Sequence, residues 1–264
     1  MRRGNPLIAD VWTGLARGGP AQLDGLRAML LQAAVLLLWW PKSDVAQMLE
    51  SEYSPRTLAA VVMAIGLTAA YHALRAGAEE ILLPGERGLR VWAHETALHP
   101  ARIVSGCVSG QLLHSAYLLL LSTPLMLMAF TVSGGEWPAL AWCVAAIVVQ
   151  ALFYRLCGAI IGLTLEAHVS AKRYAVRALL LVVYVPTGLV APLTSHLAIT
   201  YRTLGEPAAV KPAAAAMPDA AIFISIYAAA GVIAALVVHR LLWRARGGPN
   251  RPVDAARVDR VATG

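Results

Sequence analysis

Residues 103–132 read IVSGCVSGQLLHSAYLLLLSTPLMLMAFTV, an uninterrupted run without Asp, Glu, Lys or Arg. A helix needs about 20 mostly apolar residues to cross the hydrocarbon core of a bilayer, so this run predicts a membrane-spanning helix. Five other segments approach the same length and character, at about 23–40, 57–77, 138–165, 174–198 and 219–243. The sequence therefore predicts an all-α polytopic membrane protein, with six transmembrane helices in one domain of residues 1–264.

The composition agrees with a membrane location. The chain is 58% hydrophobic and only 14% charged, whereas soluble domains carry about 25% charged residues. The N-terminal residues include Asp10 and Asp24 and lack a continuous apolar core, so we expect no cleavable signal peptide there.

Three cysteines, Cys107, Cys143 and Cys157, all fall within apolar runs. An odd number of cysteines in such positions argues against a disulfide framework. We interpret them as small packing residues and predict no metal site. The alternative is a soft-metal site that Cys107 would form with His114, which lies on the same helical face.

The Lys and Arg residues predict the orientation of the chain. If six helices cross the membrane, both termini and the second and fourth loops share one side, and 17 of the 22 basic residues fall there. Four fall on the opposite side, and Arg155 lies within the fourth span. The positive-inside rule places the richer side, with both termini, in the cytoplasm. Because topology accounts for the net charge of +7, no nucleic-acid partner is needed.

Residues 5–18 predict a short amphipathic helix before the first span. Asn5 can cap it, Pro6 suits its first turn and Gly18 suits its end. One apolar face is formed by Leu7, Ile8, Val11, Trp12 and Leu15. The segment is too short to cross a bilayer, so we expect it in the membrane interface, the alternative being a frayed tail. At the other terminus, residues 244–264 are expected to form a cytoplasmic tail.

A polar segment, residues 84–100, separates the second and third spans. It begins after the break at Pro84-Gly85, contains Trp92, and reaches Pro100 just before the third span. We predict a short helix of mixed charge, which suits docking to a protein better than binding to anionic lipid. The alternative is a solvated amphipathic loop without a partner.

The same segment carries a family resemblance. Its residues Glu86, Arg87, Gly88, Leu98, His99, Pro100, Ile103, Val104 and Gly106 are similar to the pattern E-R-x-x-G-T…L-L…P…I-V-x-G-K. That pattern belongs to the permease subunits of type-2 ABC transporters, the exporter-like class with six spans. His99 stands where Thr is common in the family, and Ser109 and Gln111 occur where a Lys often follows the glycine.

The resemblance implies a coupling helix at residues 84–100 that docks on an ABC ATPase subunit. The residues expected to couple to the ATPase are Glu86, Arg87, Leu89, Arg90, Trp92, His99 and Pro100. The sequence has no G-x-x-x-x-G-K-[ST] phosphate loop, so ATP hydrolysis is expected on the partner, and no enzyme activity or cofactor in this chain. We expect two permease subunits to pair in the lipid of a bacterial cytoplasmic (inner) membrane and to export an apolar or amphipathic substrate.

Polar residues within the predicted spans are the candidates for a translocation path. Gln111, His114 and Gln150 lie near mid-depth, and such groups usually face protein or water. The alternative is ordinary hydrogen bonding between helices. Arg155 is expected to extend to the cytoplasmic surface. As an alternative it would form a gate with Glu166, although about 16 Å of helix axis separates the two residues.

Two other classes of protein remain open. Glu79 and Glu80, followed later by His114, superficially resemble the paired-glutamate motif of intramembrane CAAX-type metalloproteases. However, Pro84 occupies the position of the motif's arginine, and Gly110 stands where the partner motif has Phe. The third class is a membrane scaffold or assembly protein that transports nothing, and co-purification with an ATPase would argue against it.

Overall fold

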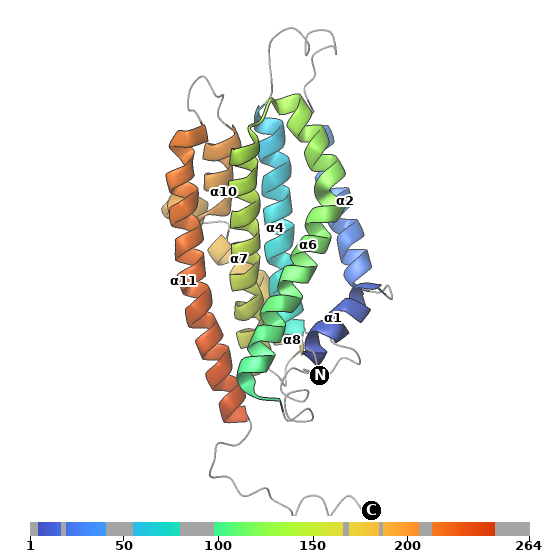
Figure 1. The fold of residues 1–264 in the computed structure, drawn as a ribbon, viewed down its shortest axis with the longest axis vertical. Coiled ribbons are helices and arrows are strands. Elements are labelled where there is room, and N and C mark those ends of the chain that lie inside the picture. Colours follow the sequence, from blue (N-terminus) through green and yellow to red (C-terminus); the bar gives the residue numbers. More distant parts are fainter. Residues whose placement is uncertain are drawn as a thin grey trace, which may run out of the picture.

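The structure is a computed structural model that describes residues 5–16, 20–40, 55–79, 98–165, 169–184, 187–205 and 213–245 (Figure 1). All regular elements within these residues are helical, which confirms the predicted all-α class. The α-helices are α1 (Pro6–Ala16), α2 (Pro20–Leu38), α4 (Pro55–Glu79), α6 (Pro100–Ser133), α7 (Trp137–Thr164), α8 (Val169–Ala178), α9 (Thr187–Val190), α10 (His196–Thr200) and α11 (Ala213–Ala245). Short π- and 3₁₀-helical turns are η1 (Leu179–Tyr184), η2 (Pro192–Thr194) and η3 (Tyr201–Gly205).

Within the described residues, four helices are long and apolar enough to cross a membrane, namely α4, α6, α7 and α11. They coincide with the predicted spans at 57–77, 103–132, 138–165 and 219–243 to within a few residues. Four helices of this kind indicate a membrane protein, as the composition predicted.

The other two predicted spans differ from these four. Segment 23–40 is helical as α2, but Asp24, Arg27 and Gln32 interrupt its apolar character, and it is not among the four. Segment 174–198 is not one helix, because α8 passes into η1, α9 and η2. Pro192 starts η2, where its missing N–H prevents a regular α-helical bond. A total of six spans therefore stays a prediction.

Helix α4 is the centre of the bundle. In its membrane-length segment 72% of the residues are buried, compared with 22% in α6 and in α11. Figure 1 shows α4 between α7 and α6, with α11 and α2 on the outer sides. Most side chains of α4 are therefore surrounded by other helices, and its buried polar side chains need partners inside the protein.

Glycines bring α4 and α7 into backbone contact. A Cβ atom added at Gly158 would lie 2.1 Å from the Leu74 carbonyl oxygen, and one at Gly77 would lie 2.3 Å from that of Arg155. A Cβ atom added at Gly162, one turn after Gly158, would lie 3.1 Å from the Ala78 carbonyl oxygen. Small residues at such spacing let helices in a membrane gain van der Waals contact, since lipid offers little hydrophobic drive for association.

A second close contact holds α1 against the start of α6. The Asn5 amide donates to the Arg102 carbonyl oxygen at 2.7 Å, and the Asn5 side-chain oxygen caps α1 by accepting from the Leu7 N–H at 3.1 Å. A Cβ at Gly106 would lie 2.9 Å from the Leu7 Cβ, and Val11 contacts Gly110 in the same way. These two glycines allow α1 to pack closely on α6.

This packing divides the apolar face predicted for α1, whose place in the membrane interface stays a prediction. Leu7, Val11 and Leu15 are buried, whereas Ile8 and Trp12 are exposed. One part of the predicted apolar face of α1 thus packs on the protein and the other part is exposed. The reason is that the two glycines of α6 allow α1 to approach closely.

Two sets of contacts mark the ends of the bundle. At one end, α1 meets the start of α6, and the His99 ring lies 6.0 Å from that of Trp243 near the end of α11. At the other end, the Thr57 hydroxyl donates to the Trp39 carbonyl oxygen at 2.7 Å, and Ser133 accepts from the Leu58 N–H at 3.0 Å. The start and the end of the described chain therefore lie at one end (Figure 1). The orientation of that end towards the cytoplasm stays a prediction.

Candidate functional site

The predicted ATPase-coupling residues fall in two groups. Glu86, Arg87, Leu89, Arg90 and Trp92 lie outside the described residues. The other two, His99 and Pro100, begin α6: the His99 Nδ1 accepts from the Ala101 N–H at 3.3 Å, and Pro100 occupies the first turn. Pro is favoured there because its fixed φ suits a helix start, so both residues have a structural role and their docking role stays a prediction.

The predicted path residues are buried but do not converge. Gln111 and His114 lie on the inner side of α6, where the Gln111 amide donates to the Ser115 hydroxyl at 3.1 Å. Gln150, on α7, instead adjoins the phenol groups of Tyr184 and Tyr227. The structure therefore separates one polar position near α4 from another near α11.

Arg155 does not reach the surface. The sequence led us to expect this side chain at the cytoplasmic face, yet it is only 4% exposed. It lies three residues before Gly158, so it shares the face of α7 that packs on α4. Its predicted partner in a gate, Glu166, lies outside the described residues.

The structure brings together a charged group that the sequence analysis did not single out as a site. We name it the Asp24 cluster and define it as Asp24, Arg27, His72 and Arg75. Arg75 Nη1 lies 3.2 Å from both carboxylate oxygens of Asp24, and Arg27 Nη1 lies 3.2 Å from Oδ1. His72 Nδ1 lies 3.6 Å from Oδ2. The cluster joins α2 to α4.

Burial makes the partners of Asp24 unequal. The Asp24 side chain is 8% exposed, and a buried carboxylate is costly unless it is paired. Arg75, at 25% exposure, is the main counter-charge, whereas Arg27 is 70% exposed and its attraction is weakened by solvent. His72 is as buried as Asp24 and carries a charge only when protonated.

From this cluster, ionisable groups continue into the bundle. The His72 and His114 rings face each other edge to face, with centroids 6.5 Å apart, and Arg155 approaches His114 from α7. Neither ring nitrogen of His114 has a hydrogen-bond partner among the described residues. Four helices, α2, α4, α6 and α7, therefore contribute to one line of titratable side chains, an arrangement that can hold or move a charge inside the protein.

A signal for this line is present in the sequence. Asp24 and Arg27 stand in an otherwise apolar helix, and His72 and Arg75 have the same three-residue spacing in the next one. Residues three apart share a helix face, so each pair could be recognised. Their meeting depends on how α2 packs against α4.

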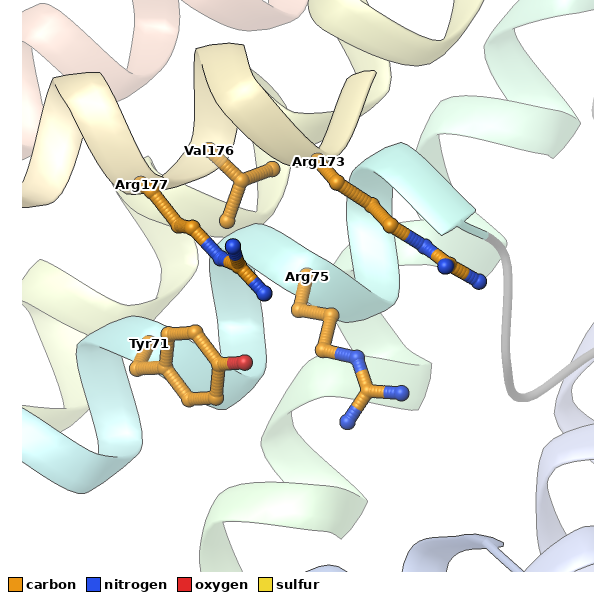
Figure 2. A pocket seen from close by; sticks show the side chains of 5 residues that line it. All are labelled: Tyr71, Arg75, Arg173, Val176 and Arg177. Atoms are coloured by element: carbon orange, nitrogen blue, oxygen red, sulfur yellow. The ribbon is translucent and has the colours of Figure 1, made fainter. Parts of the chain in front are cut away.

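Beside the Asp24 cluster lies a cavity of about 310 Å³, which we name the arginine pocket. It is lined by Tyr71, Arg75, Arg173, Val176 and Arg177. Figure 2 shows the side chains of α8 directed towards α4, from which Tyr71 and Arg75 project. Arg75 thus belongs both to the pocket and to the cluster.

The described residues contain no group of three or more His, Cys, Asp or Glu side chains placed to hold a metal ion. Cys107 and Cys143 are buried and Cys157 is half-buried, and none of the three forms a disulfide. The possible pairing of Cys107 with His114 therefore gains no third ligand within this part of the chain.

Comparison of the chain with protein-family models, curated proteins and solved structures found no match. The functional inference therefore depends on the residues themselves and on their arrangement.

Proposed function

We propose that this chain is the permease subunit of an ATP-driven ABC transporter that exports an apolar or amphipathic substrate. ATP would be hydrolysed by a separate ATPase chain, so this chain is a transport subunit and carries no cofactor. The resemblance of residues 86–106 to type-2 permeases motivates the proposal. The observation that carries it is the contact between His72 and His114, because it joins α4 and α6, the two helices that flank the expected docking segment.

The position of this contact suits transmission of a movement. His72 lies seven residues before the end of α4, about 10 Å along the helix axis. A displacement of the segment between α4 and α6 would act on both helices and alter the spacing of the ionisable groups between them. Buried ionisable side chains are costly in membrane helices and commonly mark a path for ions or substrate. A membrane scaffold that transports nothing would have no functional reason to bury ionisable side chains.

The contact between α1 and α6 gives the proposal a second support. Asn5 binds the backbone at Arg102, two residues into α6, close to the end of the expected docking segment. A movement at the start of α6 would therefore also move α1. In this proposal two permease subunits pair with two ATPases in a bacterial inner membrane, with both termini in the cytoplasm.

Trp92→Ala tests the docking step, with Glu86→Ala as the matched control from the same segment. Aromatic anchors dominate the energy of interfaces, so we expect Trp92→Ala to weaken ATPase binding by about 2 kcal/mol or more. A charge at the rim of an interface contributes less, so Glu86→Ala should be milder. The measurement is the amount of phosphate-loop ATPase that co-purifies with the tagged permease, together with its rate of ATP hydrolysis.

The two variants should insert and fold like the parent chain, which size-exclusion chromatography in detergent verifies. Parental amounts of ATPase with Trp92→Ala would exclude the proposed docking. Absence of any phosphate-loop ATPase from the parental complex, purified from its native membrane, would exclude the permease function itself.

A further inference from the structure

We infer that the arginine pocket is a binding site for a phosphate group, and specifically for the headgroup of an anionic phospholipid. The inference goes beyond the proposed function and does not depend on it. Two helices form the pocket with one pair each, Tyr71 and Arg75 from α4 and Arg173 and Arg177 from α8. Members of each pair are four residues apart, which places them on one face of their helix.

The charge of the pocket favours an oxyanion. Three guanidinium groups and one phenol hydroxyl line it, and Arg75 also binds Asp24. Guanidinium groups present paired N–H donors that match the oxygens of phosphate, and such charge-assisted bonds are the strong ones. Three positive side chains around one cavity attract an anion more strongly than a neutral ligand.

The size of the cavity restricts the ligand. About 310 Å³ lies at the lower end of the range for small-molecule pockets, roughly 300–1,000 Å³. That volume accommodates a phosphate with a small substituent, such as a glycerol phosphate headgroup.

The surroundings favour a lipid over a free ion. Beyond Arg177 the chain continues into η1, where Leu181 and Val182 are exposed large apolar side chains. Arg173 and Arg177 also lie on the side of the membrane that the charge distribution assigns to the cytoplasm. Basic pockets between membrane helices on that side bind the headgroups of anionic lipids. A phospholipid can place its phosphate among the arginines and its acyl chains along this apolar strip.

Arg75 connects the pocket to the Asp24 cluster. Its guanidinium is 3.2 Å from the Asp24 carboxylate and also lines the cavity. A phosphate in the pocket would compete with Asp24 for the same donors, so lipid binding and the charge state of the cluster are linked, and each affects the other equally.

The test measures lipid binding to the full-length purified chain by native mass spectrometry. Phosphatidylglycerol is titrated against phosphatidylcholine, and inorganic phosphate is added in a separate arm. An arginine in direct contact with the lipid phosphate should contribute about 5-fold to binding, so Arg173→Gln with Arg177→Gln should reduce the preference for phosphatidylglycerol roughly 25-fold. The control is Lys172→Gln with Arg240→Gln, which removes the same charge outside the pocket and should change the preference less than about 2-fold.

Arg177→Lys keeps the charge but loses the paired donors, so it should retain part of the preference. Equal binding of the two lipids to the parent chain, or an unchanged preference in the Arg173/Arg177 variant, would overturn the inference. Binding of inorganic phosphate that displaces phosphatidylglycerol and is lost in the same variant would show that the pocket recognises the phosphate group without the acyl chains. An equal loss of the phosphatidylglycerol preference in the pocket and control variants would show that net charge alone causes the preference. That result would also overturn the inference of a site.

Discussion

The two sides of α4 are built from different chemistry. Towards α7 the helix presents Leu74, Gly77 and Ala78, which meet glycines in backbone contact. Towards α2 and α8 it presents Tyr71, His72 and Arg75, which meet a carboxylate and a cavity. On the first side α4 itself contributes small and aliphatic residues, whereas on the second side it contributes the titratable groups His72 and Arg75. The comparison indicates that substitutions towards α7 should lower stability through lost close packing, and those on the polar side through lost charge pairing.

Gly158→Ala should cause the largest loss of stability, because the added methyl group pushes α7 away from α4. The added Cβ would lie 2.1 Å from the Leu74 carbonyl oxygen, and a backbone atom cannot move aside as a side chain can. We expect a loss of about 3 kcal/mol in the free energy of unfolding, measured in mixed micelles. Gly231→Ala on α11 is the control, since no described atom lies within 4 Å of a Cβ there. Equal stability of the two variants would mean that α4 and α7 are further apart than described.

Asp24→Asn and Arg75→Gln examine the polar side through a double-mutant cycle. Removal of either partner leaves the other charge poorly compensated, so each single variant should lose free energy of unfolding. The double variant should lose less than the sum of the two single losses. We expect a coupling of about 2 kcal/mol, below the value for a fully buried pair because Arg75 is 25% exposed.

Arg27→Gln provides the matched comparison for Arg75→Gln. The distances from the two arginines to Asp24 are equal, but Arg27 is 70% exposed. Its loss should cost less than about 1 kcal/mol. If the two arginine variants were equally destabilised, burial would not be the reason for the difference between them.

Asn5→Ala tests the contact between α1 and α6, where close packing on glycines and a polar contact occur together. The variant removes the polar contact and leaves the glycines in place. The variant loses the hydrogen bond to the Arg102 carbonyl oxygen and the cap of α1. We expect a loss of about 1 kcal/mol in the free energy of unfolding. Ser225→Ala, which removes a hydroxyl that donates to the Ala221 carbonyl oxygen of its own helix, should change stability less. A parental value for Asn5→Ala would mean that the glycines alone hold α1 on α6.

Local patterns in the sequence predicted the apolar helices well and the broken region poorly. The runs that became α4, α6, α7 and α11 were recognised because length and hydropathy are properties of a single segment. The start of α6 at Pro100 could also have been recognised, since His99-Pro100 is a cap followed by a favoured first residue. Segment 174–198 has enough apolar residues for a span, yet hydropathy says nothing about whether its backbone can remain one helix.

The sequence by itself determined the helical class, the four apolar helices and the placement of basic residues along the chain. Only the tertiary structure decided that Asp24 would meet Arg75, that Arg155 would be buried, and that the apolar face of α1 would be divided. The physical reason is that hydrophobicity acts on each segment separately, whereas a charge finds its partner only after two helices have packed. In this protein glycines set how closely α4 approaches α7 and how closely α1 approaches α6, which no pattern within a single segment shows.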